Sequence, residues 1–149
     1  FIKTIFDFNE SFPTENVIYY FNQPLWAELI AKEFEFLEGV LKYFSDKKII
    51  IKLHPLTSEK IKEKYRLLDR VQIIESNAPA EAILLSLRNC IVFTGWSSVL
   101  ITENSKCNLY FNYPIYKDID DKILKQSNLV ILDHITLVDK PDLMKFPNE

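Results

Sequence analysis

Six short, mostly apolar runs recur along this chain of 149 residues, and they set narrow limits on its fold. They are rich in β-branched and aromatic residues, which favour strands. Their apolar residues do not alternate regularly with polar ones, so each strand should be buried on both faces, as in a parallel sheet covered by helices. The runs occupy residues 17–21, 49–53, 71–75, 90–93, 107–111 and 129–132.

Segments of helical character separate these runs. The clearest is 25–44, where apolar residues recur at the spacing of one helix face. Shorter helices are expected at 59–68, 79–87, 97–104, 118–126 and 139–146. This alternation predicts an α/β fold, a doubly wound and mainly parallel Rossmann-like sheet with right-handed crossovers. The length fits one domain over residues 1–149, with residues 1–16 as a linker from an upstream domain.

Composition excludes several classes of function. The formal net charge of −3 does not suit a protein that packages nucleic acid, and no nucleic-acid partner is expected. Gly39 and Gly95 are the only glycines, which excludes a dinucleotide fingerprint and a Walker phosphate loop. Cys90 and Cys107 are expected to be buried free thiols.

No apolar run approaches the ~20 residues of a membrane-spanning helix, and no signal peptide opens the chain. We therefore expect a cytoplasmic protein, with peripheral attachment to the inner membrane as an alternative. A homodimer also remains open.

The strand expected at 49–53 ends at His54 and Pro55. In an open parallel sheet, ligands bind beyond the carboxyl ends of the strands, which is where His54 should lie. Histidine titrates near neutral pH and can donate a proton or a hydrogen bond to a phosphate leaving group. The alternative is a histidine that only hydrogen-bonds a neighbouring carbonyl group.

A second motif, Gly95-Trp96-Ser97-Ser98, follows the strand expected at 90–93. Gly95 permits a tight turn or a positive φ angle. Ser97 and Ser98 lie at an expected helix start, where hydroxyls, backbone N–H groups and the helix dipole favour an anion. The alternative is that Ser97 only caps this helix.

Together these residues resemble bacterial sialyltransferases. Lys52-Leu53-His54-Pro55 is similar to their His-Pro motif, and Gly95-Trp96-Ser97-Ser98 is similar to their Ser-Ser motif. The stretch Tyr19–Leu25, YYFNQPL, resembles the strand and Gln-Pro turn that open the nucleotide-binding half of glycosyltransferase family 52. The polysialyltransferases share the two motifs. The resemblance covers residues 17–111.

This resemblance implies the carboxyl-terminal, donor-binding half of a GT-B enzyme that uses a CMP-sugar, usually CMP-sialic acid. The acceptor would be a lipooligosaccharide or capsular glycan, and an upstream half would complete the enzyme. His54 would hydrogen-bond or protonate the departing phosphate, and Ser97 and Ser98 would hold it. Transfer would invert the anomeric carbon without a metal or other cofactor, and this fragment alone would be inactive.

Other site residues are assigned by their place in the chain. Gln23, Pro55 and Gly95 belong to the loops expected to meet at the donor, and Asn77 lies in the loop that would read cytosine. Glu103 would bond the ribose. Glu28 is the candidate general base, with a solvated first-turn acid as the alternative.

Two other functions remain open at this level. A cell-envelope transferase that uses CDP-glycerol or another nucleotide sugar would also place a His-Pro and a Ser-Ser motif after strands. A non-catalytic Rossmann-like interaction module would bind no nucleotide at all.

Overall fold

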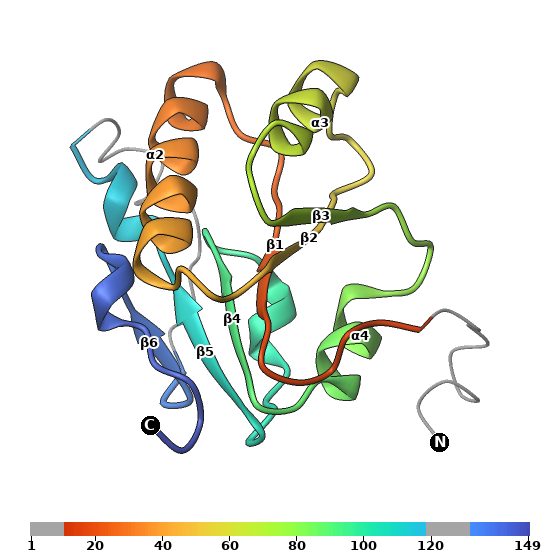
Figure 1. The fold of residues 1–149 in the computed structure, drawn as a ribbon, viewed down its shortest axis with the longest axis vertical. Helices are drawn as coiled ribbons and strands as arrows, with labels where there is room; N and C mark the ends of the chain where they lie inside the picture. Colours follow the sequence, from red (N-terminus) through yellow and green to blue (C-terminus); the bar gives the residue numbers. More distant parts are fainter. Residues whose placement is uncertain (1–10, 119–131) are drawn as a thin grey trace.

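The computed structural model describes residues 11–118 and 132–149. Its centre is a six-stranded sheet in the order β3-β2-β1-β4-β5-β6, with every neighbouring pair parallel (Figure 1). The strands are β1 Ile18–Phe21, β2 Ile49–Lys52, β3 Val71–Ile74, β4 Cys90–Thr94, β5 Cys107–Phe111 and β6 Ile135–Leu137. The predicted α/β fold with a parallel, Rossmann-like sheet is confirmed.

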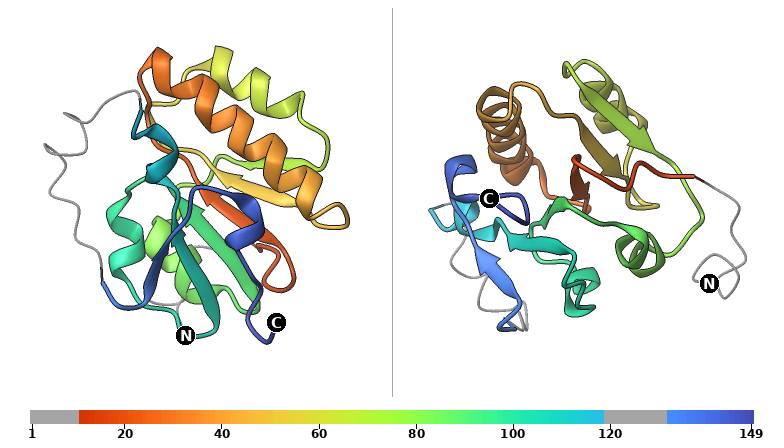
Figure 2. Two further views of the ribbon diagram at one scale, coloured as in Figure 1. Left: turned by 90° about the vertical axis from the view of Figure 1, so that its left-hand side faces the viewer. Right: turned by 60° about the horizontal axis from the view of Figure 1, so that its bottom comes forward.

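Helices cover both faces of this sheet, as the right-hand view in Figure 2 shows. The α-helices are α2 Ala27–Tyr43, α3 Glu59–Arg66 and α4 Ala80–Ser86, and the 3-10 helices are η1 Ser98–Ile101, η2 Tyr113–Tyr116 and η3 Pro141–Leu143. Helices α2 and α3 lie on one face, and α4 and η1 lie on the other.

Strand geometry explains why the strands are apolar on both sides. Successive side chains of a strand point to opposite faces. In β1, Ile18 and Tyr20 pack in the core beneath α2, whereas Tyr19 and Phe21 pack in the core beneath α4. Each face of the sheet is covered by its own helix layer. The β1 residues that point to either face are therefore apolar, and polar residues do not alternate with them.

Helix α2 buries one stripe of side chains, and an arginine far along the chain binds backbone carbonyls at and after its carboxyl end. Its buried residues include Leu29, Leu37 and Val40, at helical spacing. The Arg70 guanidinium donates to the Phe44 carbonyl at 2.9 Å and also reaches the carbonyls of Leu41 and Lys47. The bond to the Leu41 carbonyl satisfies an acceptor of the last turn of α2, and the other two bonds hold the turn that follows the helix.

The helix predicted at 97–104 is wrong, because only η1 forms there, as a single 3-10 turn. The Asn104 amide donates to the carbonyls of Leu84 and Leu87, at 2.7 and 3.0 Å. These bonds tie the segment to the end of α4, so the chain leaves the helical path early. The positive end of a helix dipole is therefore not available at Ser97.

Two further expectations fall partly outside the described residues. Most of the helix predicted at 118–126 and most of the strand predicted at 129–132 lie outside the described residues. The sixth strand of the described sheet is Ile135–Leu137. At 139–146, only the 3-10 helix η3 forms.

The cysteines are buried and free, as predicted, and Cys90 pairs in register with Cys107 across β4 and β5. Within the two described segments, no helix is long and apolar enough to cross a membrane.

The strand order places a switch point between β1 and β4. The chain leaves β1 for α2 on one face, and it leaves β4 for η1 on the other. Loops that diverge in this way open a crevice at the carboxyl ends of the strands, where ligands of doubly wound sheets bind.

Candidate functional site

A hollow of about 310 Å³ lies at the carboxyl ends of β1, β2, β3 and β4. Predicted site residues His54, Pro55, Asn77 and Ser97 all line it. The other lining residues are Phe21, Asn22, Lys52, Leu53, Ser76, Ala78, Pro79 and Ala80. The structure thus brings together residues from three loops. The first and last of these residues, His54 and Ser97, are more than 40 positions apart in the sequence.

Positive charge enters this hollow from Lys52, the last residue of β2. Lys52 is only 8% exposed, and its ammonium group donates to the Ser76 carbonyl. None of the residues that line the hollow is acidic. A lysine charge at the wall of a hollow that no acidic residue lines suits an anion such as a phosphate.

Lys52 belongs to the stretch that carries the His-Pro motif, but no role was predicted for it. The signal was a lysine that ends a run of three isoleucines. Lysine is almost never fully buried without a partner, so its place on a central strand is informative.

The His54 ring is held in one orientation by its own loop. The Leu56 N–H donates to His54 Nδ1 at 3.1 Å. A nitrogen that accepts this bond carries no proton, so the neutral ring has its proton on Nε2. His54 therefore offers Nε2–H as a hydrogen-bond donor.

Asn22, directly after β1, anchors the same loop. Its Oδ1 accepts from the His54 N–H at 3.3 Å and from the Thr57 hydroxyl at 2.6 Å. The loop after β1 thus holds the loop after β2, and this fixes the position of His54 relative to β1.

The loop after β3 contributes its middle residues to the lining of the hollow, whereas its acidic residue, Glu75, does not line it. Glu75 pairs with Lys62 and Arg66 of α3, at 2.5 and 3.7 Å. Ser76 Oγ accepts from the Ala78 N–H at 2.9 Å, which closes a tight turn and leaves Asn77 exposed at the edge of the hollow.

Gln23 joins the loops after β1 and β4 and is not among the residues that line the hollow. Its Oε1 accepts from the Trp96 N–H at 2.8 Å. The tight approach explains Gly95, since a Cβ there would lie 2.9 Å from Gln23 Oε1. Of the two alternatives for Gly95, a tight turn and a positive φ angle, the structure excludes the positive φ.

We expect Gly95→Ala to lower the free energy of unfolding by about 1 kcal/mol, because the methyl group displaces Gln23 from the Trp96 N–H. Chemical denaturation measures this loss. In Gln23→Ala, the added Gly95→Ala change should cost little more, because the clash is gone. Fully additive losses would contradict this explanation.

The structure does not bring Glu28, Ser98 or Glu103 to the hollow. All three are exposed, and none lines it. Ser98 begins the short turn η1, and Glu103 lies beyond its end, so the shortened helix accounts for both positions.

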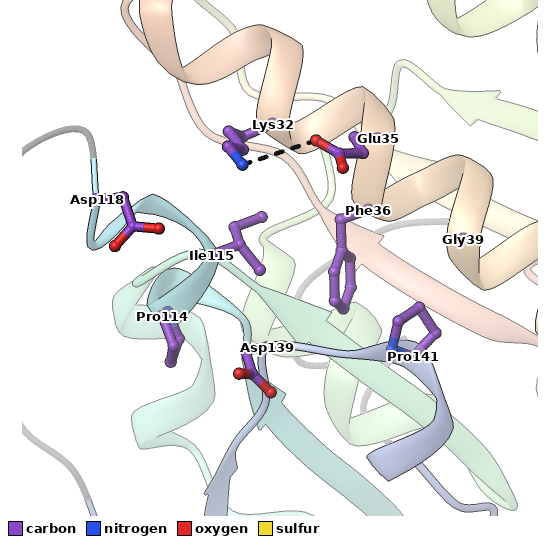
Figure 3. A pocket seen from close by; sticks show the side chains of 9 residues that line it. All are labelled: Lys32, Glu35, Phe36, Gly39, Pro114, Ile115, Asp118, Asp139 and Pro141. Atoms are coloured by element: carbon purple, nitrogen blue, oxygen red, sulfur yellow. Dashed lines mark ion pairs between the residues drawn. The ribbon is translucent and has the colours of Figure 1, made fainter.

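A second hollow, of about 300 Å³, has the opposite electrostatic character. It lies between α2, η2 and the segment around η3 (Figure 3). Lys32 is paired with Glu35 at 3.8 Å, and Asp118 and Asp139 project from the facing segments. With this excess of acids, the second hollow disfavours an anionic ligand. Among the described residues, no group of three or more His, Cys, Asp or Glu could hold a metal ion.

Comparison with protein families gives a match over most of the chain. The model of the family described as Alpha-2,8-polysialyltransferase (POLYST) matches residues 9–109, about two thirds of the chain. The chain belongs to the alpha-2,8-polysialyltransferase family. A comparison with curated proteins found no match.

The polysialyltransferase match includes both motifs of the hollow, the His54-Pro55 loop and the Ser97 turn. It confirms the predicted sialyltransferase family and with it a glycosyltransferase, a nucleotide-sugar donor and a glycan acceptor. It does not support the assignment to glycosyltransferase family 52. The place of the chain as a carboxyl-terminal half remains a prediction.

Proposed function

We propose that the hollow at the carboxyl ends of β1–β4 binds the CMP part of CMP-sialic acid, as the donor site of a sialyltransferase. The observation that carries this proposal is the convergence of Lys52, His54 and Ser97 in a hollow without acids. The acceptor would be a glycan of the bacterial surface that ends in sialic acid, in keeping with the polysialyltransferase family.

Each of the three residues has a role at the phosphate of the donor. In transfer, the acceptor oxygen attacks the anomeric carbon of sialic acid and the bond from that carbon to the phosphate oxygen breaks. CMP then leaves with an added negative charge. The Lys52 charge and the His54 Nε2–H would stabilise it, and the Ser97 hydroxyl would add a hydrogen bond.

His54 is better suited to donate a hydrogen bond than to transfer a proton. A general acid would need protons on both ring nitrogens, and the Leu56 N–H already occupies Nδ1. Direct displacement by the acceptor would invert the anomeric carbon. The acceptor proton would pass to a base outside the hollow, for which Glu28 remains the candidate in this chain.

Calorimetric titration with CMP tests the donor site, with UMP and AMP as controls for the base. We expect selective binding of CMP, unchanged by a chelator, because Lys52 and His54 would meet the phosphate charge without a metal. Equal binding of all three nucleotides, or binding that a chelator abolishes, would contradict the proposal. CDP-glycerol, tested as a donor, separates the rival transferase.

Ser97 and Ser98 form a matched pair of variants. Ser97→Ala should weaken CMP binding by about 1–2 kcal/mol through loss of a charge-assisted hydrogen bond, because Ser97 lines the hollow. Ser98→Ala should leave the affinity unchanged, because Ser98 is exposed outside the hollow. Calorimetry on both variants checks this, and equal effects would count against Ser97 as a phosphate ligand.

A further inference from the structure

A buried carboxylate lies behind the proposed donor site. Glu33, on α2, is only 1% exposed. Its Oε1 accepts from the hydroxyl of Tyr20 on β1 and, at 2.7 Å, from the hydroxyl of Tyr65 on α3. Burial raises the pKa of the Glu33 carboxyl, and the hydrogen bonds from Tyr20, Tyr65 and Asn22 oppose that shift.

These groups continue without a break to the His54 loop. The Asn22 amide donates to the Tyr65 hydroxyl at 2.8 Å and lies 3.4 Å from Glu33 Oε1. Asn22 Oδ1 in turn accepts from the His54 N–H and the Thr57 hydroxyl. Every polar group in this series has a partner of the right kind, so the orientation of the Asn22 amide is determined.

The His54 loop, residues 54–57, has little else to hold it. Its Pro55 and Leu56 are exposed, Leu56 by 76%. The bonds from the Thr57 N–H to the His54 carbonyl and from the Leu56 N–H to His54 Nδ1 are internal to the loop. Segments with few buried contacts open easily, so polar anchors decide where such a loop lies.

We propose that Glu33 is a positioning residue that acts through Tyr65 and Asn22 to hold the His54 loop against the donor phosphate. A third, smaller hollow, of about 210 Å³, is lined in part by Glu33, Asn22 and Tyr65 and separates α2 from this loop, so side-chain packing does not fill the space between them. The polar series bridges it. The effect on donor binding rests on the proposed function, whereas the position of the loop does not.

Two tyrosine variants separate positioning from ordinary stabilisation. Tyr20→Phe and Tyr65→Phe each remove one hydroxyl that donates to Glu33, so both should lower the melting temperature by similar amounts. Only the Tyr65 hydroxyl also accepts from Asn22. Tyr65→Phe alone should therefore disturb the His54 loop.

Nuclear magnetic resonance of the His54 ring nitrogens and amide exchange at His54, Leu56 and Thr57 report on the loop without any nucleotide. In Tyr65→Phe we expect altered ring nitrogen shifts, faster amide exchange and about three- to tenfold weaker CMP binding. Tyr20→Phe should match the wild-type protein in all three. Glu33→Gln keeps an oxygen acceptor and should also keep the loop in place.

Identical His54 signals and loop exchange in Tyr65→Phe and Tyr20→Phe would overturn the positioning role. If the wild-type protein failed to bind CMP, the donor-site proposal would fall. The His54 signals would then still decide whether Glu33, Tyr65 and Asn22 position the loop.

Discussion

Replacement of His54 by alanine is expected to slow sialic acid transfer by about 100-fold or more, the usual effect of removing a donor that stabilises developing charge. The departing phosphate would lose the Nε2–H that the Leu56 contact keeps available. The fold should persist, because His54 is half-buried on a loop and, within the described part of the chain, its ring makes a single hydrogen bond, to the Leu56 N–H of the same loop.

His54→Gln distinguishes a hydrogen-bond donor from a general acid. The glutamine amide can donate a hydrogen bond to the departing phosphate, but it cannot transfer a proton to it. We expect His54→Gln to retain clearly more activity than His54→Ala. The rate of CMP release from CMP-sialic acid, measured in an active form of the enzyme with acceptor present, checks both variants. Equal rates for the two variants would favour proton transfer, and a wild-type rate in His54→Ala would remove His54 from the site.

Replacement of Lys52 by methionine should weaken CMP binding by about 10- to 100-fold, because a largely buried charge beside a phosphate contributes a strong charge-assisted interaction. Methionine keeps most of the apolar stem in the β2 strand, so the sheet should tolerate the change. Calorimetric titration with CMP measures the loss, and thermal unfolding verifies that the variant is folded.

Cytidine is the control for this variant, since it keeps the base and the ribose but lacks the phosphate. The Lys52 ammonium also donates to the Ser76 carbonyl, so the substitution could act through the loop after β3. If the charge acts on the phosphate, cytidine should bind the wild-type protein and Lys52→Met equally. A parallel loss of cytidine binding would assign the effect to the loop.

Much of the sheet could be predicted, because strands that are buried on two faces appear in the sequence as short, mostly apolar runs. The runs at 17–21 and 49–53 correspond to β1 and β2, each one residue shorter than predicted, and the run at 107–111 is β5 without change. The meeting of His54 with Ser97 also followed from a general rule, since parallel strands place their carboxyl ends along one edge.

The shortened turn at η1 could not be predicted from local signals. Ser97 and Ser98 are plausible helix-start residues, and the segment to Asn104 lacks proline and glycine. Its end is decided by the Asn104 amide, which bonds carbonyls 17 and 20 residues away. A bond at that distance in the chain leaves no periodic signal.

Lys52 and Glu33 were missed for a related reason. In the sequence, each reads as one more charged residue of a soluble protein, and such residues are mostly exposed. Glu33 is buried only because Tyr20, Asn22 and Tyr65 arrive from other elements to satisfy its oxygen.

Local patterns in the sequence suffice for the α/β class, for the order of the strands up to β5 and of the helices up to α4, and for the two motifs that place this chain with the sialyltransferases. These depend on local burial patterns and short residue strings. The burial of charged groups and the choice of serines and acids that reach the hollow follow from the tertiary fold. Those outcomes depend on contacts between residues far apart in the chain, which local sequence patterns do not record.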